Sequence, residues 1–112
     1  MRIIHVHLDA AQGSVVVVPD PEVVFEGDEI VWEIRAPGRA IAKVEFEIQQ
    51  GAKKLRHSQK LQHERARLRF VAPKAKTKNK QPARYKYTVR GVHGSGAVLA
   101  EADPVIIVVP PE

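Results

Sequence analysis

The side chains best suited to catalysis lie in a Gly-rich stretch near the C-terminus, "GVHGSG" at 91–96, which holds His93 and Ser95. A hydrolase needs a base within hydrogen-bond reach of its nucleophile and an acid that orients the base, and two residues of one loop do not provide that set. Gly-rich loops that bind phosphate lead into a helix N-terminus, whereas a strand-like segment follows this one. We therefore interpret the stretch as a turn that needs glycine's backbone freedom, and we predict no catalytic residue and no enzyme.

Two further histidines, His5 and His7, form an H-x-H pair that lies on one side of a predicted strand. Two imidazoles at this spacing can share zinc, copper or nickel, but no third ligand is near them in the sequence. We therefore assign no metal and keep binding through His5 and His7 as an alternative. The chain has no cysteine, which excludes a disulfide, a thiolate metal site and a cysteine nucleophile. His57 and His63 are interpreted as solvated polar surface.

The most informative stretch is "PKAKTKNKQPAR" at 73–84, in which Lys74, Lys76, Lys78 and Lys80 alternate with small or polar residues. In an extended chain these ammonium groups lie on one side, about 7 Å apart, which is near the phosphate spacing of a nucleic-acid strand. No aromatic residue is interleaved, so base stacking is not indicated. The stretch is either an arm that contacts phosphates or an acidic protein, or a solvated loop that protects a sheet edge from aggregation.

Charge is distributed unevenly along the chain. Residues 51–90 hold 14 of the 18 lysines and arginines and one acid, a net charge of +13. The other 72 residues hold 4 basic and 12 acidic residues, a net charge of −8. The candidate residues for contact with an acidic protein or a polyanion are Lys74, Lys76, Lys78, Lys80, Arg84, Arg65, Arg67 and Arg69.

The elements that must position these residues are strands. Apolar and polar residues alternate in segments 2–8, 28–34, 43–49, 65–71 and 84–90, and segments 14–19 and 104–110 are apolar on both faces. Frequent Gly and Pro residues separate these segments. Residues 51–63 lack alternation and are expected to form a short helix or a long loop. The expected inward residues are Ile30, Trp32, Ile34, Val44, Phe46, Ile48, Leu68, Phe70, Tyr85, Tyr87, Val89, Ile106 and Val108.

The pattern predicts a single all-β domain over residues 1–112, an antiparallel Greek-key β-sandwich of seven to eight strands, with a basic insertion or loop region around 51–84. Within it, "GDEIVWEI" at 27–34, "VEFEI" at 44–48 and Tyr85 and Tyr87 of "YKYTV", followed by Gly96 and a closing apolar strand, resemble the cupredoxins, the plastocyanin-like blue-copper proteins. The resemblance covers both ends of the chain but not 50–80. It implies a cupredoxin-like sandwich.

The resemblance also identifies where copper ligands would stand. A blue-copper site uses two imidazoles, a thiolate and a weak axial thioether. The corresponding positions hold Ala42, Val89, Val92 and Ala97, all of them apolar. His93 is one residue too late, and a one-residue slip in an extended segment turns a side chain to the other face. We therefore predict a copper-free domain without a cofactor. Copper-free members of the family, such as the ephrin ectodomains, serve in recognition.

We expect a binding or assembly module that contacts an acidic protein partner, or another copy of itself, through the basic region. A nucleic-acid-associated protein that uses the Lys and Arg residues of 51–90 is the second hypothesis. The N-terminus lacks the apolar stretch of a secretory signal, and no apolar run approaches the roughly 20 residues of a membrane span. A cytoplasmic protein that does not contact membranes is the corresponding expectation.

Overall fold

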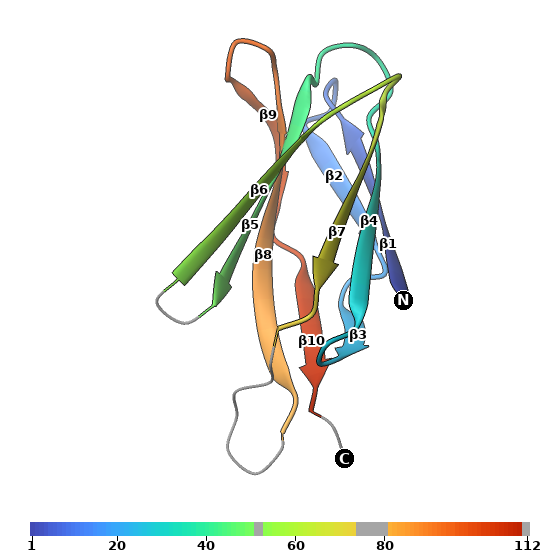
Figure 1. The fold of residues 1–112 in the computed structure, drawn as a ribbon. Helices are drawn as coiled ribbons and strands as arrows, with labels where there is room; N and C mark the ends of the chain where they lie inside the picture. The colour runs from blue at the N-terminus through green and yellow to red at the C-terminus, as the bar shows by residue number, and fades with distance from the viewer. Residues whose placement is uncertain (51–52, 74–80, 111–112) are drawn as a thin grey trace.

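The computed structural model describes residues 1–50, 53–73 and 81–110, and the chain in these ranges is all-β (Figure 1). None of it is helical, so no membrane-crossing helix is found there. Ten strands follow one another: β1 (Arg2–Asp9), β2 (Ser14–Val18), β3 (Glu22–Phe25), β4 (Glu29–Arg35), β5 (Lys43–Gln50), β6 (Lys53–Lys60), β7 (Arg65–Val71), β8 (Ala83–Val92), β9 (Val98–Ala102) and β10 (Val105–Val109).

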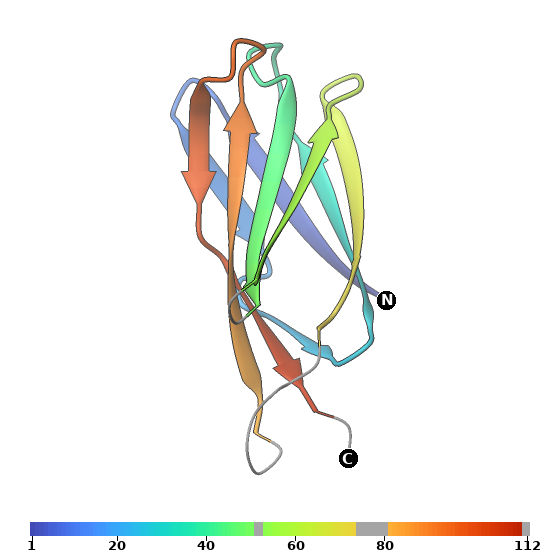
Figure 2. The same cartoon turned by 60° about the vertical axis from the view of Figure 1, so that its left-hand side comes forward.

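The strands form two mixed sheets that face each other as an open sandwich (Figure 2). The four-stranded sheet has the order β2-β1-β4-β7, and the six-stranded sheet has the order β3-β10-β8-β5-β6 with β9 beside β8. Two neighbouring pairs are parallel, β1 with β4 and β3 with β10. The expected antiparallel sandwich of seven to eight strands is therefore corrected to a mixed one with ten described strands.

The parallel pair β3–β10 arises because the chain changes sheets early. The "PDP" segment at 19–21 ends β2, since proline cannot donate to a ladder, and its two X-Pro peptide bonds are cis. β3 then enters the six-stranded sheet, and the side chain of Asp20 accepts a hydrogen bond from the N–H of Val105 at 3.0 Å. The last three residues of β3 are all apolar ("VVF"), so no alternation marks this short strand in the sequence.

For the described residues 53–63, the expected short helix or long loop is wrong. Residues 53–60 form β6, which pairs with β5 over its whole length. Its inward residues are Leu55, His57 and Gln59, because these stand opposite Ile48, Phe46 and Val44. A histidine and a glutamine in inward positions hide the alternation from a hydrophobicity pattern, and pairing with a strongly alternating neighbour overrides the weak local signal.

The core lies between the sheets, and alternation identified most of it. Ten of the thirteen expected inward residues are buried, while Leu68, Phe70 and Tyr85 are only half-buried. Two of these exceptions belong to β7, the edge strand of the four-stranded sheet. Gly91, in β8, is also fixed by packing, because a Cβ atom there would meet Cδ1 of Ile41 at 2.8 Å and Cδ2 of Leu8 at 3.1 Å.

Trp32 is the centre of this core. It belongs to β4, and its ring centroid lies 4.9 Å from that of Phe46 and 5.4 Å from that of Tyr87, both in the opposite sheet. The indole Nε1–H donates a hydrogen bond to the Tyr87 hydroxyl at 3.2 Å. Both side chains are buried, so this bond satisfies two polar groups that water cannot reach. The bond also fixes the position of β4 in one sheet relative to β8 in the other.

The hairpin between β6 and β7 is unusually tight for its sequence. Gln62 and Arg65 exchange backbone hydrogen bonds of 2.8 and 3.1 Å, which leaves a two-residue loop. The two loop residues, His63 and Glu64, have φ values of 53° and 66°. Positive φ at both central residues is the type I′ geometry, which favours Asn-Gly and costs free energy for other residues.

We predict that removing the Tyr87 hydroxyl destabilises the core. Tyr87→Phe leaves the Trp32 N–H buried and unpaired, which should lower the free energy of unfolding by about 1–3 kcal/mol. Urea denaturation measures the change. The control is Lys86→Gln, an exposed neighbour on β8, which should stay within about 0.5 kcal/mol of the parent. Equal stability of the two variants would contradict the role of the bond.

The same variant has a pH signature. Burial raises the pKa of the Tyr87 hydroxyl well above its usual value. Because the folded protein keeps this group neutral, the associated stability is complete below about pH 10 and is lost as the pH rises further. The fall in stability between about pH 9 and 11 should therefore be shallower in Tyr87→Phe than in the parent.

A second prediction concerns the hairpin. The double change His63→Asn with Glu64→Gly should raise the free energy of unfolding by about 1 kcal/mol, since it relieves two left-handed residues at the cost of extra chain entropy. Gln62→Gly is the control, because Gln62 has no positive φ; it should destabilise. If both variants lower the melting temperature, the turn is not strained.

Candidate functional site

The structure separates the predicted contact residues. Arg65, Arg67 and Arg69 project from the outer face of β7, whereas Arg84 lies on β8 in the other sheet. Lys74, Lys76, Lys78 and Lys80 lie outside the described residues. The predicted set is therefore not one continuous surface in the described part of the chain.

Two of the three β7 arginines already have acidic neighbours. Register places β7 antiparallel to β4, so that Arg67 is directly opposite Glu33. The guanidinium of Arg67 contacts the Glu33 carboxylate at 2.6 Å, and Arg69 contacts Glu29 at 3.8 Å. These exposed pairs neutralise charge and contribute little to stability.

Arg65 is different, because a second arginine stands directly opposite it. Arg35, the last residue of β4, is its register partner, and on the other side of Arg35 the parallel register places His7 of β1. All three side chains are exposed. Neither arginine has an ion pair within residues 1–50, 53–73 and 81–110. We call Arg35 and Arg65, which His7 adjoins, the cation row, and Arg35, Arg65, Arg67 and Arg69 the arginine face.

The cation row is unfavourable for the isolated protein. Side chains directly opposite each other in a sheet have Cβ atoms only about 5 Å apart, and like charges in such a pair are destabilising. Two guanidinium groups at this spacing offer up to ten N–H donors and suit a carboxylate or a phosphate, which accepts two parallel hydrogen bonds from each fork. The two arginines therefore have the chemistry to hold an anion.

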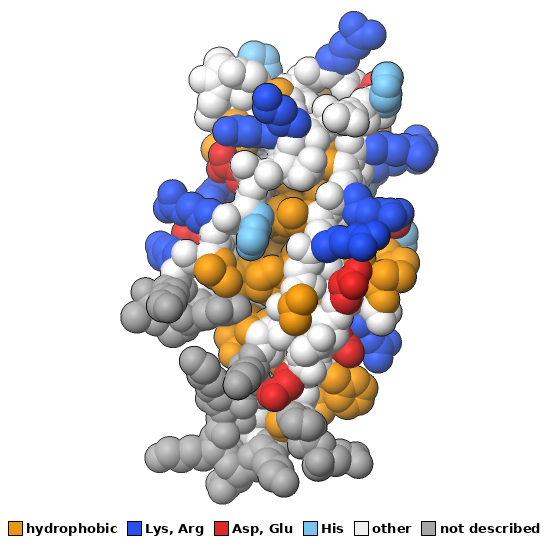
Figure 3. Space-filling view, in the orientation of Figure 1, with side chains coloured by type: hydrophobic (Ala, Val, Ile, Leu, Met, Phe, Trp, Pro, Cys, Tyr) orange, Lys and Arg blue, Asp and Glu red, His pale blue; other side chains and the backbone are white. Residues whose placement is uncertain are grey.

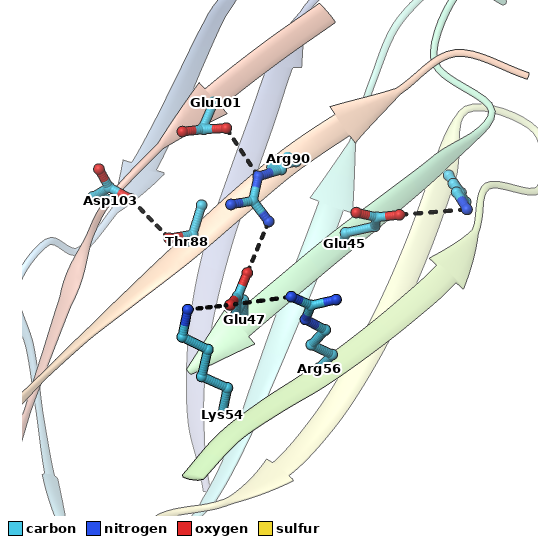
Figure 4. Close-up of polar contacts among 9 residues, drawn as sticks. Glu45, Glu47, Lys54, Arg56, Thr88, Arg90, Glu101 and Asp103 are labelled. Atoms are coloured by element: carbon cyan, nitrogen blue, oxygen red, sulfur yellow. Dashed lines mark hydrogen bonds and ion pairs between the residues drawn. The ribbon is translucent and has the colours of Figure 1, made fainter. Parts of the chain in front are cut away.

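On the outer face of the six-stranded sheet, in contrast to the cation row, basic side chains are paired with acidic ones (Figure 4). Glu47 of β5 accepts a hydrogen bond from Arg90 of β8 at 3.0 Å and pairs with Lys54 and Arg56 of β6 at 3.5 and 3.8 Å. Arg90 also donates to Glu101 of β9 at 2.9 Å. This network joins four strands, and it lines a shallow hollow on that face.

The pKa directions agree with a neutralised network. The hydrogen bond from Arg90, followed by the charges of Arg56 and Lys54, lowers the pKa of the Glu47 carboxyl. The hydrogen bonds to Glu47 and Glu101 raise the pKa of the Arg90 guanidinium. Because charges of both signs are already matched here, the cluster leaves less for a ligand to gain than the cation row does.

The histidines do not assemble into a metal centre in the described structure. His5 and His7 lie on the outer face of the four-stranded sheet, where their neighbours across β4 are Glu33 and Arg35. The described ranges contain no group of three His, Asp or Glu side chains placed to hold a metal. His93 closes its own turn instead: its Nδ1 lies 2.9 Å from the Ser95 hydroxyl and accepts from the Ser95 N–H at 3.1 Å.

The resemblance to cupredoxins matches four positions to copper ligands, and these positions lie near one end of the six-stranded sheet. The N–H of Ala42 donates to the carbonyl of Val92 at 2.8 Å, and the N–H of His93 donates to the carbonyl of Ala97 at 2.8 Å. Val89 is buried in register with Phe46. None of these side chains carries a ligand atom, so the residues present do not fit copper.

The sequence analysis did not identify two residues that matter for the candidate sites, Arg35 and His57. Arg35 ends the pattern "EIVWEIR", where its alternation with Ile34 predicts an outward side chain, but only the long-range register reveals that it faces Arg65. His57 was expected to be solvated surface, yet it faces inward, with its ring centroid 5.7 Å from that of Phe70. No sequence signal identifies it, because inward histidines are uncommon.

Comparisons with known proteins find neither a matching family nor a similar curated protein.

The cation row generates a prediction about stability. Arg65→Glu replaces a repulsive cross-strand pair with an attractive one and should raise the free energy of unfolding by about 0.2–1 kcal/mol. Arg67→Glu is the matched control, because it makes the same change one row away, where it removes an ion pair and places two acids opposite each other. It should lower stability by a similar amount.

Urea denaturation at low ionic strength measures both variants. If Arg65→Glu destabilises the protein as much as Arg67→Glu does, the two arginines of the row do not repel each other.

Proposed function

We propose that the protein is a non-catalytic, copper-free, cupredoxin-like binding or assembly module that contacts an acidic protein partner through its basic residues. The observation that carries the proposal is the Arg35–Arg65 pair, two arginines in direct cross-strand register, neither of which forms an ion pair with an acid of the described residues. Free energy lost to their repulsion is recovered when a carboxylate binds between them.

The cupredoxin-like part of the proposal has separate support. The resemblance was drawn from short segments far apart in the sequence, and those segments lie side by side in the sandwich: β5 with "VEFEI" pairs with β8, which carries Tyr85 and Tyr87. The backbone hydrogen bond between Ala42 and Val92 joins two positions that the resemblance assigns to the same former metal site. Because none of the four matched positions carries a ligand atom while the sandwich is formed, recognition is favoured over copper redox chemistry.

The charge pattern favours a protein partner over a nucleic acid. On the arginine face, Glu29 and Glu33 stand among the arginines, so a phosphate backbone running along β7 meets carboxylates as well as cations. The net charge of −8 outside residues 51–90 would also repel a long polyanion that wrapped the domain. An acidic protein can instead place single carboxylates at the cation row.

The experiment is an NMR titration of the full chain with a ten-residue oligoglutamate peptide. We expect saturable shifts of β4 and β7 amides and of the Arg35 and Arg65 guanidinium signals. The double variant Arg35→Gln with Arg65→Gln should lose at least about tenfold in affinity, because two charge-assisted contacts disappear. Arg84→Gln, an exposed arginine of the other sheet, is the matched control and should bind like the parent.

A DNA duplex titrated in parallel tests the alternative. A nucleic-acid-binding protein would bind it tightly at low salt, with log K falling against log salt with a slope of about −3 to −4 for four phosphate contacts. Such binding, together with weak binding of oligoglutamate or an equal loss in Arg84→Gln, would overturn the proposed function.

A further inference from the structure

The side of the sandwich between β6 and β7 is open. The two strands are joined by their hairpin, but beyond the Gln62–Arg65 bridge they do not pair, and they are the edge strands of opposite sheets (Figure 1). β6 pairs along one edge with β5, and within the described residues no strand lies along its other edge. Among the described strands, the alternate N–H and C=O groups along this edge of the eight-residue strand therefore have no partner, and such an edge can pair with another chain.

The inner face of this opening is apolar and only half-covered. From β7 it receives Ala66, Leu68 and Phe70, and from β6 it receives Leu55 and His57, all of intermediate exposure. Figure 3 shows hydrophobic side chains at the surface along the middle of this face, with Lys and Arg side chains on both sides of them. In a closed sandwich such residues would be fully buried.

His57 lies in the opening and carries a polar atom without a partner. Its ring packs edge-on against Phe70, and its Nε2 atom is buried without a hydrogen-bond partner in the described structure. Buried polar atoms are rarely left unpaired in native proteins. The imidazole would have to turn for Nε2 to reach a polar atom of an incoming chain.

The outer face of β6 sets the charge of the occupant. Lys54, Arg56 and Lys60 are exposed there, and Lys54 and Arg56 share a single acid, Glu47, which also binds Arg90. Lys60 stands directly opposite Lys43. A second copy of the chain paired through β6 would bring these cations into the same rows, where like charges are destabilising. Self-association of two copies through β6 is therefore unfavourable.

The chain contains an example of a strand that fits. β5, with Val44, Phe46 and Ile48 inward and Glu45 and Glu47 outward, pairs with β6 along its other edge. Any strand beside β6 has its outward residues next to the same lysines and arginine and its inward residues next to Leu55 and His57. Alternation of acidic with apolar residues satisfies both faces.

We propose that the free edge of β6 binds an extended segment of a partner protein by strand addition, and that this segment alternates acidic with apolar residues. The acidic side chains lie beside Lys54, Arg56 and Lys60, and the apolar ones cover Leu55, His57 and Phe70 and close the sandwich. The inference rests on the proposed function in that the partner is acidic, but it concerns another surface and a specific backbone conformation.

The probe is a capped heptapeptide, EVEFEIE, compared with the same composition in the order EEEEVFI. Amide hydrogen exchange of the full chain reports the contact. At saturating EVEFEIE, the alternate β6 amides that do not donate to β5 should exchange at least about tenfold more slowly, while EEEEVFI should leave them unchanged.

N-methylation of the peptide separates strand addition from charge attraction. Methyl groups on the backbone nitrogens of one alternate set block the edge that pairs, and those on the other set face away. One methylated peptide should therefore lose at least about tenfold in affinity while the other binds like the parent. Equal binding of both, or equal binding of EEEEVFI, would overturn the inference.

The experiments distinguish a failure of strand addition from a failure of the proposed function. If both peptides bind equally and lose affinity in the Arg35→Gln, Arg65→Gln variant, strand addition is wrong and the proposed function stands. If EVEFEIE protects β6 but oligoglutamate binds the Arg35→Gln, Arg65→Gln variant like the parent, strand addition stands and the cation row is not the contact site. If EVEFEIE does not protect β6 and oligoglutamate does not bind, both are wrong.

Discussion

The structure depends on the contact of Trp32 with the opposite sheet. Its ring lies against Phe46 and Tyr87, and its N–H is satisfied by the Tyr87 hydroxyl, so two sheets with no covalent cross-link are held at one fixed point. From this point the sandwich closes on the side where β2 lies near β9 and stays open where β6 and β7 diverge. A single apolar centre in a small domain is enough to fold it, but not enough to cover both sides.

Charge is arranged around this centre in two ways. On the six-stranded sheet, Glu47 gathers Arg90, Lys54 and Arg56, and the ion pairs join strands that are already hydrogen-bonded. On the four-stranded sheet, Arg35 and Arg65 repel each other. A protein selected only for stability would place an acid at one of these positions, since a single substitution removes the conflict. The retained conflict is the reason that we propose the cation row as a binding site.

Sequence reasoning identified the elements whose signal is local. Alternation placed β4, β5, β7 and β8 and their inward residues, because one face of each strand packs on Trp32 or its neighbours. It missed β6, whose inward side includes His57 and Gln59, and it missed β3 and β9, which are short. The outward direction of Arg65, Arg67 and Arg69 also follows from alternation. The pairing of Arg35 with Arg65 does not, because it depends on which strands become neighbours and in which register, and that is decided by packing between distant segments.

The most direct test of the account is the coupling free energy between Arg35 and Arg65, from a double-mutant cycle of Arg35→Gln and Arg65→Gln by urea denaturation. In the free protein the account predicts an unfavourable coupling of about 0.2–1 kcal/mol. With saturating oligoglutamate the coupling should vanish or become favourable, because a shared carboxylate replaces the repulsion. A coupling of zero in the free protein that oligoglutamate leaves unchanged would contradict the account.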